Sequence, residues 1–186
     1  MSSDNPLEPV YKAFLVSRDS FKVAMRTVRE QHEPFIRRTQ FVGATPEEAQ
    51  AALEQASQQA SDLAVLALFA TFERYVIEHL QTANERLAAG HPTEYSRKLA
   101  EKFKAEVEYW RFEEILDLFK PELDADQVGQ VKQIKKYRDW IAHRNTNKPV
   151  PTQATPETAF DVLSKLTDQI RQIHTIPNQV DSAAPP

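Results

Sequence analysis

The sequence lacks cysteine altogether, has only three glycines in 186 residues, and contains no long hydrophobic run. The lack of cysteine excludes disulfides, thiolate metal sites and cysteine nucleophiles. An all-β fold of this length would need many tight turns, which favour glycine, so the low glycine content favours helices. The most apolar stretch, at residues 63–70, is too short to span a bilayer, and the first residues do not resemble a secretory signal. We therefore expect a cytoplasmic protein with no membrane contact.

The distribution of helix-forming residues predicts an all-α fold. Ala, Glu, Gln, Lys and Leu, which are good helix formers, dominate the middle of the chain. Thr-Pro-Glu sequences at residues 45–47 and 155–157 are typical helix starts, with Thr as the N-cap and Pro in the first position. Helices are expected at residues 6–32, 46–89, 93–119 (with a break near Trp110), 124–143 and 156–173. The prediction is an antiparallel bundle of four to five helices with one long helix, forming a single domain over residues 1–176, and a disordered tail over 177–186.

Charge is unevenly distributed along the chain. The net charge is −4, but residues 132–148 contain six basic residues and one acid, a local charge of +5. The basic residues are Lys132, Lys135, Lys136, Arg138, Arg144 and Lys148. This window is either the solvated face of a helix or a small basic patch that binds a polyanion.

Two charged residues lie on apolar helix faces. On a helical wheel, Arg138 falls within a face formed by Val131, Ile134, Tyr137, Ile141 and Ala142. Glu73 falls near the middle of a second face, formed by Leu66, Phe69, Val76, Ile77 and Leu80. Because a buried arginine needs a partner, Glu73 and Arg138 are expected to meet, either across the bundle or at a subunit interface. They would form an ion pair that fixes helix register, or a site in which Arg138 binds a phosphate and Glu73 orients it.

The stretch from Arg138 to His143, Arg-Asp-Trp-Ile-Ala-His, resembles the Arg-x4–6-His motif of the HEPN superfamily, in particular its RiboL-PSP type. A polar residue commonly follows the arginine in that motif, and Asp139 occupies this position. The motif also ends a late helix of a predicted all-α bundle, with one more helix after it. The resemblance covers about residues 50–173. Three other pairs have similar spacing: Arg26/His32, Arg74/His79 and Arg86/His91.

The resemblance implies a metal-independent endoribonuclease of the toxin or defence type, acting as a homodimer in which two motifs face each other. His143 would serve as general base or acid on the ribose 2′-hydroxyl, and Arg138 would stabilise charge on the phosphate. Asp139 would orient one of them, with Lys135, Arg144, Asn145 and Glu73 in support. Asn145 stands where toxins paired with a nucleotidyltransferase carry Tyr, which puts that pairing in doubt, although an antitoxin partner remains an expectation.

Two other interpretations stay open. The resemblance also covers non-catalytic members, and the Ala/Gln-rich start of the helix over residues 46–89 needs a partner or a second copy to pack against. The chain would then be a helical binding or dimerisation module. A metal site is not expected, because no Glu-x-x-His pair lies on an apolar face, and no other cofactor is expected because glycine-rich phosphate loops are absent.

Overall fold

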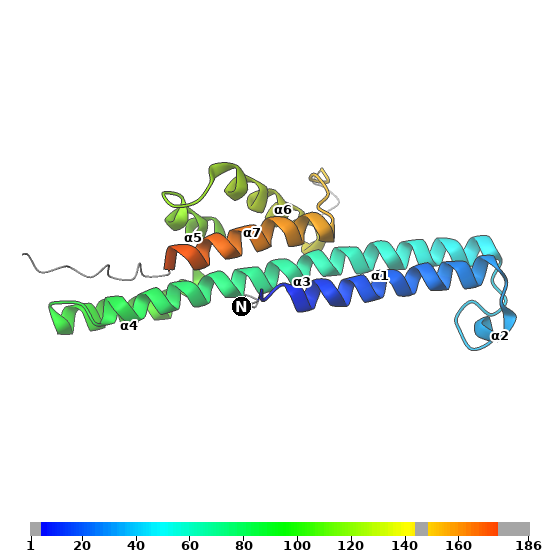
Figure 1. Cartoon of the computed structure of the whole chain (residues 1–186), viewed down its shortest axis with the longest axis horizontal. Coiled ribbons are helices and arrows are strands. Elements are labelled where there is room, and N and C mark those ends of the chain that lie inside the picture. Colours follow the sequence, from blue (N-terminus) through cyan, green and yellow to red (C-terminus); the bar gives the residue numbers. More distant parts are fainter. Residues whose placement is uncertain (1–4, 144–148, 175–186) are drawn as a thin grey trace, which may run out of the picture. The chain divides into compact units, whose positions relative to one another are not determined.

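The computed structural model describes residues 5–143 and 149–174. These residues form seven α-helices, one 3-10 helix and no strand, which confirms the predicted all-α fold with one long helix (Figure 1). The elements are α1 (Glu8–Arg29), α2 (Glu33–Ile36), α3 (Pro46–Ala88), α4 (Thr93–Glu106), η1 (Val107–Tyr109), α5 (Phe112–Phe119), α6 (Ala125–His143) and α7 (Pro156–His174). The predicted tail at residues 177–186 lies outside the described residues.

The structure contains more helices than the four to five predicted from the sequence, for two local reasons. Pro34 lies in the first turn of α2, a four-residue helix in the connection between α1 and α3. The predicted break near Trp110 is also present, because this residue adopts an extended conformation (φ −68°, ψ 148°) between η1 and α5. None of the described helices is both long and apolar enough to cross a membrane.

The two Thr-Pro-Glu sequences start helices as predicted. At the start of α3 the Thr45 hydroxyl accepts a 3.2 Å hydrogen bond from the backbone N–H of Glu48, and the Glu48 carboxylate accepts one of 2.9 Å from the N–H of Thr45. This reciprocal arrangement is a capping box, which satisfies N–H groups that the helix itself leaves unpaired. At the start of α7 the Thr155 hydroxyl accepts a 3.2 Å hydrogen bond from the N–H of Thr158.

The chain divides into two compact units. The first combines Met1–Thr71 with Gln133–Asp161, and the second combines Phe72–Lys132 with Val162–Pro186. Three of the helices, α3, α6 and α7, therefore contribute residues to both units.

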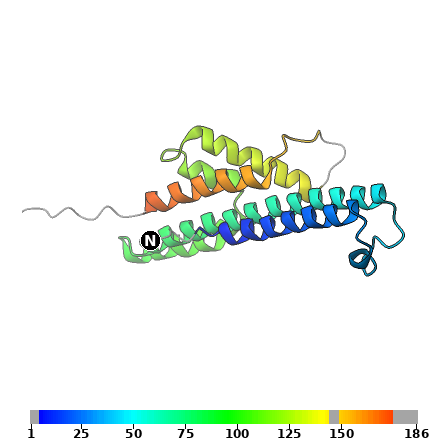
Figure 2. The ribbon, with the colours of Figure 1, turned by 45° about the vertical axis from the view of Figure 1, so that its right-hand side comes forward.

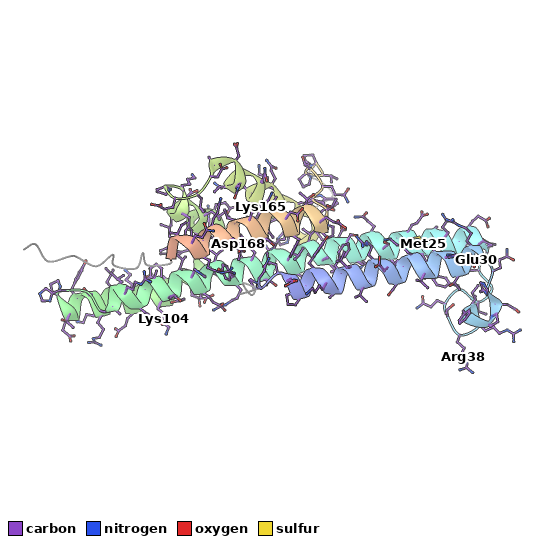
Figure 3. All side chains as sticks on the ribbon, in the orientation of Figure 1. Met25, Glu30, Arg38, Lys104, Lys165 and Asp168 are labelled. Atoms are coloured by element: carbon purple, nitrogen blue, oxygen red, sulfur yellow. The ribbon has the colours of Figure 1, made fainter. Side chains whose placement is uncertain are left out.

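The first unit contains α1 beside the first part of α3 (Figures 1 and 2). The buried side chains of Val28, Ala49 and Leu53 form a cluster there. Partly buried hydrophobic residues, including Met25 on α1 (Figure 3), pack against this cluster. Apolar side chains along α1 and α3 are thus removed from water, which is the main favourable contribution to packing the two helices together.

The second unit contains α4, which runs back beside the last part of α3 (Figures 1 and 2). The ring of Phe72 on α3 lies edge-to-face against Phe112 on α5, with 5.8 Å between centroids. A buried polar contact adds to this packing, because the Asn84 Nδ2 on α3 donates a 2.9 Å hydrogen bond to the carbonyl of Ala100 on α4.

Candidate functional site

The candidate site predicted from the sequence lies on the last turns of α6. The start of this helix is fixed by Asp124, whose Oδ1 accepts hydrogen bonds from the backbone N–H groups of Asp126 (2.9 Å) and Gln127 (3.0 Å). The helix then continues through His143. Two of the predicted supporting residues, Arg144 and Asn145, lie outside the described residues.

Arg138 is held by contacts on two sides. Its side chain is 28% exposed, and Nη1 donates a 2.9 Å hydrogen bond to Oδ1 of Asp139. Its guanidinium carbon lies 5.4 Å from the ring centroid of Phe69 on α3, within cation–π range. The arginine predicted to lie on an apolar face is therefore half-buried, with an aromatic ring below it and a carboxylate beside it.

Asp139 lies between two cations. Its Oδ2 accepts a 2.7 Å hydrogen bond from Nζ of Lys135, one turn earlier on α6, and its Oδ1 accepts the bond from Arg138. Partial burial raises the pKa of Asp139, but the hydrogen bonds from Lys135 and Arg138 outweigh this effect, so the pKa lies below its ordinary value. The sequence predicted that Asp139 orients either His143 or Arg138. The structure shows that it contacts Arg138.

His143 is exposed and is the last residue of α6. Because α6 is helical from Arg138 through His143, the two side chains leave the helix axis about 140° apart. A single copy of α6 thus does not bring Arg138 and His143 onto one face. A site that contains both a guanidinium and an imidazole therefore needs a second protein surface to supply one of the two groups.

The predicted apolar face of α6 is largely correct. Val131, Ile134, Tyr137 and Ile141 are all buried. The prediction was wrong for Ala142, which is exposed. This residue lies at the edge of the face on a helical wheel, about 100° from Ile141, and therefore points away from the packed side.

The predicted contact between Glu73 and Arg138 stays a prediction. Glu73 is partly buried on α3, as expected for a charged residue on an apolar face, and belongs to the second unit. Arg138 belongs to the first unit. Within its own unit, Arg138 contacts Asp139 and Phe69.

Sequence reasoning missed a buried polar contact beneath the site. The Tyr137 hydroxyl donates a 2.9 Å hydrogen bond to Oδ1 of Asp62 on α3, and both residues are buried. The same oxygen accepts a 3.0 Å bond from Nε2 of Gln58. A signal was available, because Asp62 precedes Val65 and Phe69 by three and seven residues and so shares their helix face.

Trp140 adds an aromatic surface next to Tyr137. The two rings are stacked, with centroids 6.1 Å apart and an interplanar angle of 15°. The Trp140 indole Nε1 is buried and has no hydrogen-bond partner within the described part of the chain.

Within residues 5–143 and 149–174, no group of three or more Cys, His, Asp or Glu side chains is arranged to hold a metal ion. The end of α6 carries the exposed imidazole of His143, the half-buried guanidinium of Arg138 and the carboxylate of Asp139. These groups are suited to acid–base and electrostatic catalysis. The chain matches no protein-family model, no curated protein and no solved structure.

Proposed function

We propose that this protein is a HEPN-like endoribonuclease that cleaves RNA without a metal ion, at a site formed when the α6 ends of two copies come together. His143 acts on the 2′-hydroxyl and Arg138 binds the phosphate. Asp139 positions Arg138, and Lys135 in turn positions Asp139.

The observation that carries the proposal is the way Arg138 is held. Its contacts with Asp139 and Phe69 fix the guanidinium before any ligand binds. A group held in advance stabilises developing charge without having to reorganise during the reaction. His143, by contrast, is exposed at the end of the same helix, where a substrate reaches it.

The need for two copies follows from the helix geometry. Arg138 and His143 leave α6 about 140° apart, so one phosphodiester does not meet both from a single helix face. A two-fold axis between copies repeats each side chain on the facing surface, which supplies the missing partner.

The cleavage reaction needs no cofactor, because the RNA and two histidines account for every bond and proton. His143 takes the proton from a ribose 2′-hydroxyl, and the resulting oxygen attacks the adjacent phosphorus. The bond from phosphorus to the 5′-oxygen breaks, and the histidine of the second copy donates a proton to that leaving oxygen. The products are a 2′,3′-cyclic phosphate and a 5′-hydroxyl. Arg138 stabilises the negative charge that accumulates on the phosphate oxygens.

The test is RNA cleavage by the full chain in the presence of EDTA, with end-group analysis of the products. We expect cyclic-phosphate ends from the wild type. His143→Ala should lower the rate by roughly 100-fold or more, as is typical when a general acid–base group is removed. Arg138→Lys keeps the charge but loses the planar fork, so it should also cut RNA much more slowly.

His91→Ala is the matched control. His91 is also exposed and follows Arg86 at the spacing by which His143 follows Arg138. It lies just after Gly90, beyond the end of α3. The proposal predicts wild-type cleavage by this variant. Equal rates for the wild type, His143→Ala and His91→Ala would show that any observed cleavage comes from a contaminant or another site.

A helical dimerisation module is the second candidate, and one observation favours it. The first half of α3 presents an exposed row of mostly small apolar residues spaced three or four apart: Ala52, Ala56, Gln59, Leu63, Ala67 and Ala70. Leu63 is 56% exposed. This spacing follows one helix face and suits packing against a helix of a second copy. If the chain is a dimer without ribonuclease activity and Leu63→Glu makes it monomeric, this second function replaces the first.

A further inference from the structure

A groove in the second unit lies between the last part of α3 and α4, and none of its lining residues belongs to the proposed ribonuclease site. Its volume is about 400 Å³. That volume is within the range of small-molecule sites, which span roughly 300–1,000 Å³. The groove is lined by charged and polar side chains, so its chemistry suits a polar ligand.

Small residues create the hollow. Ala88 on α3 and Ala100 on α4 both line it, and each contributes only a methyl group. Asn84, which is 9% exposed, lines the groove as well. Its Nδ2 donates a 2.9 Å hydrogen bond to the carbonyl of Ala100, which fixes the orientation of the side-chain amide.

The oxygen of the same amide is not satisfied by a hydrogen bond within the described residues. Asn84 Oδ1 is buried and accepts no hydrogen bond from the described residues. A buried acceptor without a donor costs about 1–3 kcal/mol. Because an amide oxygen only accepts, the group that satisfies it must be an amine, an amide N–H, a hydroxyl or a water molecule. Asn84 itself lines the groove, so a donor group on a ligand bound there lies next to this amide.

Most charged residues around the groove are already paired. Arg74 Nη1 lies 3.1 Å from Oε1 of Glu108, and Arg97 Nη1 lies 3.0 Å from Oε1 of Glu101. These pairs neutralise each other at either end of the groove. They contribute no net attraction for a singly charged ligand.

Two charged groups on opposite walls remain. Lys104 on α4 (Figure 3) and Glu85 on α3 line the groove. Neither forms an ion pair with any residue in the part of the chain that the structure describes. A ligand that fits both must carry an anionic and a cationic group and be neutral overall.

We propose that this groove binds a small zwitterion of the amino-acid type. The carboxylate of the ligand pairs with Lys104. Its ammonium group pairs with Glu85 and donates a hydrogen bond to Oδ1 of Asn84. This site is independent of the proposed RNA cleavage, because the residues that line the groove belong to α3, α4 and η1, and none of them is in the α6 site.

The test measures ligand-induced thermal stabilisation of the full chain with each of the standard amino acids, followed by calorimetric titration of those that stabilise it. Acetate and ethylamine, which each carry one of the two charges, are tested alongside. We expect at least one amino acid to raise the Tm while acetate and ethylamine do not. Lys104→Gln and Glu85→Gln should each weaken binding by about tenfold or more, equivalent to about 1.4 kcal/mol.

Lys98→Gln is the control, because Lys98 is an exposed lysine on the same helix and does not line the groove. It should bind as the wild type does. All three substituted residues are exposed, so the variants are expected to fold. The proposal is overturned if no amino acid raises the Tm at about 100 mM. For a single site with a Kd of about 1 mM, this concentration would add about 2.7 kcal/mol to the free energy of unfolding. It is also overturned if the Lys104→Gln variant binds the amino acid as tightly as the Lys98→Gln variant does. In that case a water molecule would donate the hydrogen bond to Oδ1 of Asn84.

Discussion

The Tyr137 hydroxyl on α6 donates a 2.9 Å hydrogen bond to the Asp62 carboxylate on α3, and the two residues are 75 positions apart in the sequence. Both are buried, so the bond fixes how these segments pack. The next residue on α6, Arg138, lies over the ring of Phe69, which follows Asp62 on α3 by seven residues. The position of Arg138 thus depends on the register that Tyr137 and Asp62 establish.

Tyr137→Phe should therefore lower the free energy of unfolding by about 1–2 kcal/mol, because it leaves a buried carboxylate oxygen with one donor fewer. The ring stays in place, so little packing is lost. Urea unfolding followed by circular dichroism measures the change. Tyr95→Phe is the control, since Tyr95 is 65% exposed. Equal effects of the two substitutions would show that the hydrogen bond contributes nothing measurable.

Asp139→Asn should destabilise the protein in a pH-dependent way. The folded-state pKa of Asp139 is lower than its ordinary value, which is about 3.9 in an unfolded chain. The charged carboxylate therefore adds stability above about pH 4, and this contribution disappears as the pH falls through the folded-state pKa. For a partly exposed pair we expect about 0.2–1 kcal/mol at pH 7.

The measurement is the difference in unfolding free energy between the wild type and Asp139→Asn from pH 7 to pH 3. It should stay constant down to about pH 4 and then shrink. Asp161→Asn provides a comparison on an exposed residue of α7, and it should have a smaller effect at pH 7. A difference that grows as the pH falls would contradict the assigned contacts with Lys135 and Arg138.

If two copies form the ribonuclease site, specific activity should fall on dilution. Arg138 and His143 leave α6 about 140° apart, so a monomer cannot present both to one phosphate. Cleavage rate per chain should follow the dimer fraction measured by light scattering over the same concentrations. A constant rate per chain at concentrations where only monomers are present would exclude a site shared between copies.

Gly129→Ala should stabilise the protein, by about 0.5–1 kcal/mol, because Gly129 lies inside α6 and glycine is a poor helix former. An added Cβ there meets no atom within 4 Å. Gly43→Ala is the opposite case, since Gly43 has a φ of +81°, a backbone conformation that alanine rarely adopts. Thermal unfolding should rank Gly129→Ala above the wild type and Gly43→Ala below it. The reverse order would contradict a helical backbone at Gly129 and a left-handed one at Gly43.

Local sequence signals were enough to predict where most of the longer helices begin and end. Capping threonines, prolines in first turns and the scarcity of glycine act over a few neighbouring residues, so they are readable without a fold. This is why Pro46 starts α3 and why the chain breaks near Trp110, as predicted. Helical periodicity likewise placed Tyr137 and Arg138 on the apolar face of α6 and Glu73 on that of α3.

The contacts of these side chains depend on the tertiary fold. Periodicity shows which side of a helix is buried but not which residue faces it, because contact partners depend on how distant segments are aligned. Arg138 meets Phe69 and Asp139, and Tyr137 meets Asp62, an acid that the sequence pattern did not single out. The groove beside Asn84 likewise exists only because α4 folds back along α3, so that Ala88 and Ala100 line the same hollow.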